Sequence, residues 1–280
     1  MINLQDNFKL MKNKFHNIFS KDKNIIGMIH VQALPGTPDN HLSPSIIIEK
    51  AIQEALVYQE AGIDALMIEN MHDVPYQKNK AGHEISSLMA IISYEIKRQT
   101  GLPLGMQILA GANKEALAAV FNSGADFIRA EGFVFGHLAD EGYMDSNAAE
   151  LLRYRKQIGA ENIAVFTDIK KKHSSHALTA DLDISEIAHA AEFFHSDGLI
   201  ITGIHTGSAA DINEIKRVKQ QVKIPVLVGS GVTIENVDKY LSIADALIVG
   251  SYFKKDGFWQ NDVDATRVKE FMQRVNTLSY

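Results

Sequence analysis

The sequence contains no cysteine, and this absence excludes disulfide bonds, cysteine-liganded metal sites and cysteine nucleophiles. It also has no apolar run near the roughly 20 residues that a membrane-spanning helix needs. The first residues lack the continuous apolar core of a secretory signal. Positive charge is not in excess, because the formal net charge is −6, and this argues against nucleic acid or an anionic membrane as the main partner. We therefore expect a cytoplasmic protein.

The chain instead has the composition of a soluble globular protein, with 280 residues of which 46% are hydrophobic and 22% charged. Eight short apolar runs recur along it, each followed by a longer amphipathic segment. The runs are 25–31, 65–70, 103–109, 126–132, 164–170, 198–203, 225–231 and 246–251. Continuous apolar runs are typical of parallel strands covered by helices on both sides. Residues 25–280 are therefore predicted to form one (β/α)8 TIM barrel, with an open doubly wound sheet as the alternative.

Residues 1–24 are predicted to form an amphipathic helical extension. Their apolar side chains recur at helical spacing, with lysines between them: Leu4, Phe8, Met11, Phe15, Ile18 and Phe19. This pattern favours a helix that caps the bottom of the barrel. A helix that contacts a membrane surface or a partner is the alternative.

Polar residues gather where the apolar runs end, whereas the starts of the runs are more apolar. The ends carry His30, Glu69, Asn70, Gln107, Arg129, Glu131, Asp168, Lys170, Thr202 and His205. In a barrel of this class the active site is built at the carboxyl ends of the strands. Polar groups at the mouth lose water and must find partners, so their concentration there predicts a functional site.

The seventh and eighth runs end in Gly229-Ser230-Gly231 and in Val249-Gly250-Ser251. The loops after the seventh and eighth strands of such barrels often bind phosphate. Glycine leaves backbone N–H groups uncovered, and a following helix adds the positive end of its dipole. Thr233 is predicted to cap that helix. We therefore predict that a phosphate or other anion binds here, although a tight turn alone would also use glycine.

The segment Thr167–His173 has the densest cluster of chemically active residues. Asp168 and Lys170 alternate along a strand, so they are predicted to point to the same side. A lysine there could stabilise charge or form a Schiff base. The predicted catalytic residues are His30, Glu69, Glu131, Asp168, Lys170 and His173. The predicted ligand-binding residues are Asn70, Gln107, Arg129, Lys172, Thr202, Gly229, Ser230, Gly231, Gly250 and Ser251.

Several motifs resemble the BtpA/SgcQ family. They include Gly27–His30 with Leu34–Pro38, Met67–Asn70 with Asp73, Gly124–Arg129, Lys172-His173, Ile200–Gly203 with Thr206-Gly207, Val226–Thr233, and Ile248–Gly250 with Lys255–Gly257. The resemblance runs from Ile25 to the last helix and implies a TIM barrel. The family is named for a cyanobacterial factor of photosystem I biogenesis, and other members accompany sugar-metabolism genes. Arg129-Ala130-Glu131 departs from the Arg-Val-Asn that is usual in the family.

Three functions fit these features. The first is a lyase of the aldolase type, or an isomerase, that acts on a small phosphorylated metabolite. The second is an assembly factor without chemistry. The third is a hydrolase or nucleoside-processing enzyme that uses a divalent metal, whose ligands would come from carboxylates and histidines on different strands. The sequence identifies no cofactor, and it leaves open whether a divalent metal binds. We expect the protein to be a homo-oligomer.

Overall fold

The computed structural model describes residues 14–203 and 207–278. Eight parallel strands form a closed barrel in the order β1-β11-β10-β9-β7-β4-β3-β2, which confirms the predicted TIM barrel and excludes the open sheet. The barrel closes because Ile26 of β1 pairs with Ala65 of β2 on one side and with Ile248 of β11 on the other. The strands are β1 (Asn24–His30), β2 (Ala65–Glu69), β3 (Leu104–Gln107), β4 (Phe127–Ala130), β7 (Ala164–Ile169), β9 (Gly198–Thr202), β10 (Val226–Gly229) and β11 (Ala246–Val249).

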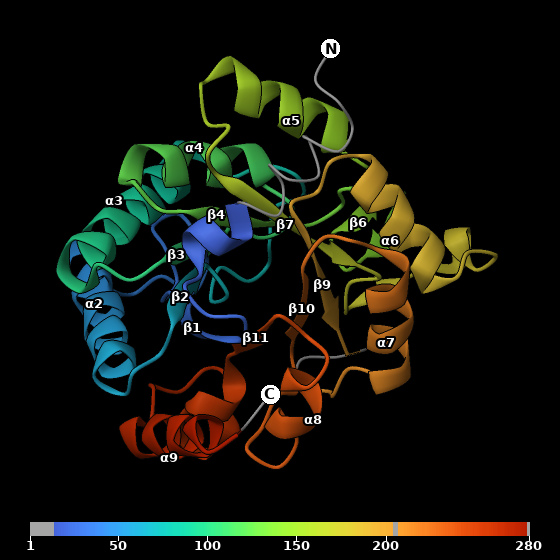
Figure 1. Ribbon diagram of the computed structural model, residues 1–280. Coiled ribbons are helices and arrows are strands. Elements are labelled where there is room, and N and C mark those ends of the chain that lie inside the picture. Colours follow the sequence, from blue (N-terminus) through green and yellow to red (C-terminus); the bar gives the residue numbers. More distant parts are fainter. Residues whose placement is uncertain (1–13, 204–206, 279–280) are drawn as a thin grey trace.

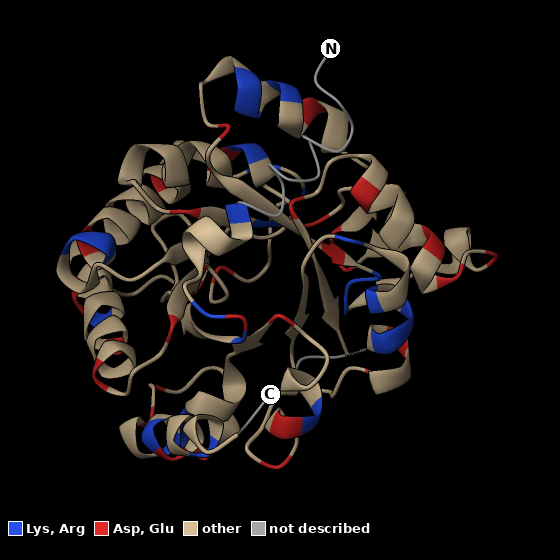
Figure 2. Ribbon diagram, in the orientation of Figure 1, with Lys and Arg blue, Asp and Glu red and all other residues tan. Residues whose placement is uncertain are grey.

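Helices surround the barrel, as Figure 1 shows. They are α2 (Pro44–Glu60), α3 (His83–Thr100), α4 (Asn113–Ser123), α5 (Ala148–Gln157), α6 (Ile184–Phe193), α7 (Ile212–Gln221), α8 (Val237–Leu241) and α9 (Ala265–Asn276). Short 3-10 helices are η1 (Ala177–Thr179), η2 (Ser251–Phe253) and η3 (Lys255–Gly257). Basic and acidic residues are interspersed over the outer helices (Figure 2).

Along β1, side chains alternate between two apolar clusters. Ile25 and Ile29 belong to the cluster between strands and helices, whereas Ile26 and Met28 belong to a second cluster inside the barrel. This alternation follows from the two-residue period of a strand. The continuous apolar runs in the sequence therefore contain two different sets of buried residues.

Part of the predicted N-terminal extension fills the bottom of the barrel. Residues 14–18 are helical, and Phe15 and Phe19 are each 2% exposed. Both rings join the interior cluster, with the Phe19 ring 5.8 Å from that of Phe127 and the Phe15 ring 6.2 Å from that of Phe166. Leu4, Phe8 and Met11 lie outside the described residues. The described part of the extension thus contributes Phe15 and Phe19 to the barrel core.

Four aspartates hold the starts of neighbouring strands together. Asp64, Asp126, Asp197 and Asp245 come immediately before β2, β4, β9 and β11 respectively. Each carboxylate accepts a backbone N–H from the preceding strand of the barrel at 2.8–2.9 Å, from Ile25, Leu104, Val165 and Val226 respectively. Each is also paired with a cation, namely Lys21, Lys97, Arg155 with Lys14, and Lys219. These bonds fix the strand register from below.

A small three-stranded sheet, in the order β6-β5-β8, lies beyond the main barrel. Its strands are β5 (His137–Ala139), β6 (Gly142–Met144) and β8 (Ser174–Ser175). They come from the loops that follow β4 and β7, so the sheet joins two loops on one side of the mouth. The sequence analysis did not predict it.

We expect Phe19→Ala to lower the free energy of unfolding by about 3–5 kcal/mol, because it leaves a cavity inside the barrel. Denaturant unfolding followed by circular dichroism measures this. Phe193→Ala is the matched control, since this side chain is 73% exposed, and its effect should stay within about 0.5 kcal/mol. Similar losses for both variants would contradict the role of Phe19.

Candidate active site

The inward positions at the ends of the strands form a polar layer above the interior cluster. His30, Glu69, Gln107, Arg129, Asp168 and Thr202 continue the inward-facing sides of their strands, and each is at most 8% exposed. At this level β10 ends in Gly229, and Gly250 follows β11 directly. Six strands therefore place a polar side chain in the mouth, and two leave space.

A cavity of about 260 Å³ occupies that space. Met28 and Ile248 line its base, and Glu69, Arg129 and Lys172 line it from the charged side. The loops after β10 and β11 line the rest, through Gly207, Ser230, Gly231, Val232, Thr233, Gly250, Ser251, Tyr252 and Gly257, together with Arg267 of α9. The mouth thus joins the two glycine-containing loops to buried charged groups.

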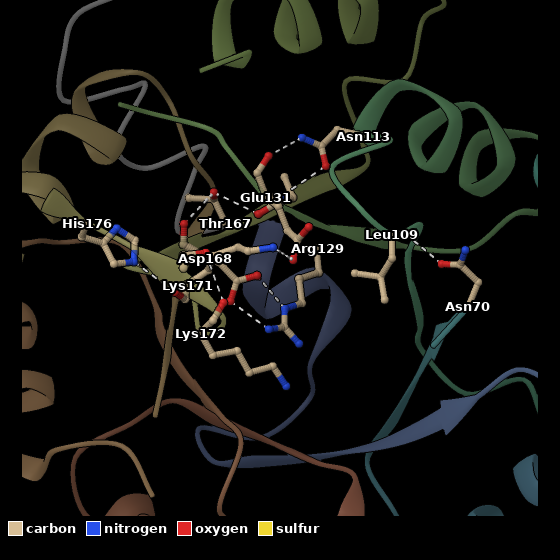
Figure 3. A network of polar contacts seen from close by, with 12 residues as sticks. Asn70, Leu109, Asn113, Arg129, Glu131, Thr167, Asp168, Lys171, Lys172 and His176 are labelled. Carbon is tan, nitrogen blue, oxygen red and sulfur yellow. Dashed lines mark hydrogen bonds and ion pairs between the residues drawn. The ribbon is translucent and has the colours of Figure 1, made fainter. Parts of the chain in front are cut away.

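Arg129 and Asp168 form a bidentate ion pair in this layer. Arg129 donates from Nε to one carboxylate oxygen at 2.7 Å and from Nη2 to the other at 2.8 Å (Figure 3). The two side chains are 7% and 1% exposed. Asp168 and Lys170, which were predicted to point to the same side of the strand, thus have different partners. Lys170 follows the end of β7 with φ of +46°, and its Nζ donates to the Leu182 carbonyl instead.

The groups that border the cavity have shifted pKa values. Burial raises the pKa of Glu69, although the charges of Arg129 and Lys172 act in the opposite direction. Burial lowers the pKa of Lys172, which the charge of Glu69 only partly offsets. The two shifts move both groups towards their neutral forms.

His30 is a second candidate for proton transfer. Its Nδ1 lies 3.0 Å from the Trp259 carbonyl, which can only accept a hydrogen bond, so Nδ1 carries the proton. Burial, followed by the charge of Lys254, lowers the pKa of His30 well below its usual value. The ring is therefore neutral, and its Nε2 is an acceptor at the wall of the cavity beside Gly250.

The two glycines after β10 and β11 serve different purposes. Gly231 has φ of +64°, and a Cβ there would lie 2.4 Å from backbone atoms of Ser208 and Ala209. It is required by close packing with the loop after β9. A Cβ at Gly250 would lie 3.3 Å from His30 Nε2, so that glycine widens the cavity.

Thr233 does not cap a helix as predicted. Its backbone N–H donates to the Asn236 side chain at 2.8 Å, and α8 begins only at Val237. The Asn236 amide also donates to the Gly231 carbonyl, so it holds the loop after β10 in place. A helix as short as α8 adds little positive dipole to this loop.

Arg267 adds a cation to the wall of the cavity, and it was not among the site residues predicted from the sequence. It lies in the first turn of α9, lines the cavity, donates from Nε to the Tyr252 carbonyl at 2.6 Å and lies over the Tyr252 ring. A cation in the first turn opposes the helix dipole. Its unfavourable position at the start of the helix is the signal in the sequence that could have identified Arg267 as a candidate site residue.

Several predicted site residues lie elsewhere. Asn70 bonds to Asp73 and to the Leu109 N–H, so its amide organises loops and it does not line the cavity. His173 is exposed and does not line the cavity either. His205 lies outside the described residues. Three buried atoms below or beside the cavity have no hydrogen-bond partner within the described residues: Gln107 Oε1, Glu131 Oε2 and Thr202 Oγ1.

Within residues 14–203 and 207–278, no group of three or more histidine, aspartate or glutamate side chains is arranged to hold a metal ion. In the same part of the chain, no helix is long and apolar enough to cross a membrane.

The fold and the mouth define a (β/α)8 barrel with a polar cavity at the carboxyl ends of its strands. The sequence model of the BtpA family matches residues 21–277, and the chain belongs to that family. An uncharacterised Caenorhabditis elegans protein, labelled mitochondrial, is 51% identical over 91% of this chain and 93% of its own length. The putative sgc region protein SgcQ of Escherichia coli is 34% identical over 92% and 96%. The cytoplasmic location stays a prediction.

Solved structures with low sequence identity share the fold. The (S)-3-O-geranylgeranylglyceryl phosphate synthase of Thermoplasma acidophilum, solved with sn-glycerol-1-phosphate, is 17% identical, with a TM-score of 0.59 over 99% of this chain and 100% of that chain. The N-(5'-phosphoribosyl)anthranilate isomerase of Pyrococcus furiosus is 14% identical, with a TM-score of 0.55 over 91% and 100%.

We expect Asp168→Ala to lower the free energy of unfolding by about 3–5 kcal/mol, because it leaves the buried Arg129 charge unpaired. Urea unfolding of the two single variants and of the Asp168→Ala/Arg129→Ala double variant measures this. The double variant should lose clearly less than the sum of the two single losses. Additive losses would show that the two side chains are not coupled.

His137 should make the fold sensitive to acid. Burial, with the charges of Lys171 and His176, lowers its pKa from 6.5 to about 4. The unfolded chain therefore binds more protons between these values, so stability falls as the pH falls from 6.5 towards 4. His137→Gln should reduce this loss, as measured by denaturant unfolding at several pH values. An unchanged pH profile would be contrary to expectation.

Proposed function

We propose that this protein is an enzyme that acts on a small phosphorylated metabolite bound in the mouth cavity, as an aldolase-like lyase or an isomerase. One observation carries the proposal. A single cavity joins the loops after β10 and β11, with Arg267, to the buried groups Glu69 and Lys172.

Phosphate binding is supported by the loop side of the cavity. Ser230, Gly231, Gly250 and Ser251 line it, and the Arg267 guanidinium supplies fixed positive charge. Two enzymes that share the barrel fold are named for phosphorylated compounds: one for a glyceryl phosphate and the other for a phosphoribosyl compound. The volume of about 260 Å³ is below the 300–1,000 Å³ usual for drug-sized ligands, which favours a small metabolite.

The charged side of the cavity supports the proposed lyase or isomerase reaction, in which a bond to carbon is broken. The raised pKa of Glu69 brings this carboxyl closer to neutrality, which suits general acid–base catalysis. His30 Nε2 is an acceptor on the same cavity. Arg129 is held by Asp168, so it provides a fixed positive charge for a developing oxyanion. Asp168 acts in this scheme by positioning Arg129.

A thermal-shift screen of sugar phosphates and their unphosphorylated counterparts tests binding. A ligand at 100 times its dissociation constant should stabilise the protein by about 2.7 kcal/mol. Arg267→Gln should lower the affinity for the phosphorylated ligand by roughly 10- to 100-fold, because a hydrogen bond to a charged group is lost. Titration calorimetry measures the change.

Arg274→Gln is the matched control, since it makes the same substitution on α9 and Arg274 does not line the cavity. It should leave the affinity unchanged. Glu69→Gln should retain binding of the compound found and lose its turnover. A screen without any phosphate-dependent shift would refute the proposal and favour an assembly factor.

A further inference from the structure

Three consecutive lysines follow β7, and their amines have different surroundings. Lys170 Nζ donates to the Leu182 carbonyl at 3.0 Å. Lys171 Nζ lies 3.1 Å from Glu131 Oε1. In Figure 3 Lys171 reaches towards Glu131, whereas Lys172 extends the other way, past Arg129. Only the third lysine lines the mouth cavity.

The Lys172 amine has no direct ionic partner among the described residues. Within residues 14–203 and 207–278, its Nζ has neither a hydrogen bond nor an ion pair, although Glu69, Asp168 and Glu131 act on it through their charges. The nearby carboxylates are already used, because Asp168 binds Arg129 and Glu131 binds Lys171. Lys254, another lysine near His30, is held by Glu54 at 2.7 and 2.9 Å.

The lowered pKa of the Lys172 amine suits a nucleophile. Burial lowers the pKa of Lys172, which increases the share of uncharged amine near neutral pH. Burial also raises the pKa of Glu69, which keeps a proton on that carboxyl to a higher pH. Both residues line the same cavity as the loops after β10 and β11. A ligand anchored there by phosphate would present its other end to Lys172.

We propose that Lys172 is a catalytic residue that forms an imine with the carbonyl carbon of a phosphorylated aldehyde or ketone. This rests on the proposed function, because the phosphate holds the carbonyl beside the amine. It narrows the substrate class from phosphorylated metabolites in general to those with a free carbonyl group.

The step is balanced without any oxidant or reductant. The Nζ lone pair forms the new C–N bond, the C=O π electrons move to oxygen, and a proton passes from nitrogen to that oxygen to give a carbinolamine. Glu69 then protonates the hydroxyl, the C–O bond breaks, and water leaves. The product is a protonated imine, whose positive charge withdraws electrons from the neighbouring C–C or C–H bond. That bond is the one cleaved by a lyase or deprotonated by an isomerase.

Reductive trapping tests the proposal. The full-length protein is incubated separately with glycolaldehyde phosphate, dihydroxyacetone phosphate and glyceraldehyde 3-phosphate, then treated with borohydride, and the adduct is located by peptide mass spectrometry. We expect one main adduct, on Lys172, with at least one of these compounds. Excess inorganic phosphate should suppress it, and the unphosphorylated aldehyde or ketone should not form it.

Three variants separate an imine from a simple charge. Lys172→Arg keeps the positive charge and should retain phosphate binding in the thermal-shift assay while losing the adduct. Lys172→Gln should also lose the adduct. Lys170→Gln is the matched control and should keep it, because the Lys170 amine lies outside the cavity. Circular dichroism checks that each variant is folded.

The proposal that Lys172 forms an imine would be overturned if adducts were spread over exposed lysines and the Lys172→Arg variant formed the same adducts. If phosphorylated compounds still stabilise the protein in that case, the proposed function stands without it. If no compound binds and no adduct forms, both the proposed function and the imine at Lys172 are refuted. Labelling of Lys172 should also persist to lower pH than labelling of exposed lysines, and the opposite order would count against the neutral amine.

Discussion

Closure of the parallel barrel determines where every functional group of this protein lies. Hydrogen bonds between β1 and β11 leave the main sheet without an edge, so each strand has one side facing the interior and one facing the helices. The four aspartates at the strand starts hold neighbouring strands in register by accepting backbone N–H groups. A shift of one residue would turn the inward side chains outward. The polar layer at the mouth exists because this register is fixed.

Some charged groups of the mouth are held in ion pairs, whereas others are not. Arg129 is held by Asp168, and Lys171 by Glu131. A buried charge without a partner is costly, so these pairs are expected to be rigid. In the part of the chain that the structure describes, Lys172 and Glu69 have no such direct partner, and burial shifts the pKa of each towards the neutral form. The pairing of their neighbours therefore leaves these two groups available for chemistry.

Prediction from the sequence succeeded where periodicity is local. The eight apolar runs all became barrel strands, because a run buried on both sides must lie between the interior and the helices. Asp64 and Asp126 directly precede two of these strands, but no role was predicted for them from the sequence. Their bonds to Ile25 and Leu104 cross between strands, and nothing within a single segment reveals such a partner.

The sequence by itself determined the barrel, the level at which polar residues collect, and the two glycine-containing loops after β10 and β11. These follow from alternation and from residue type, which are properties of short segments. Only the tertiary structure decided which of three adjacent lysines enters the cavity, because a backbone turn at Lys170, with φ of +46°, ends the alternation there. It also brought Arg267 to the mouth from the last helix and gave Asp168 its partner on β4. These contacts join residues far apart in the chain, and the folded barrel alone sets their distances.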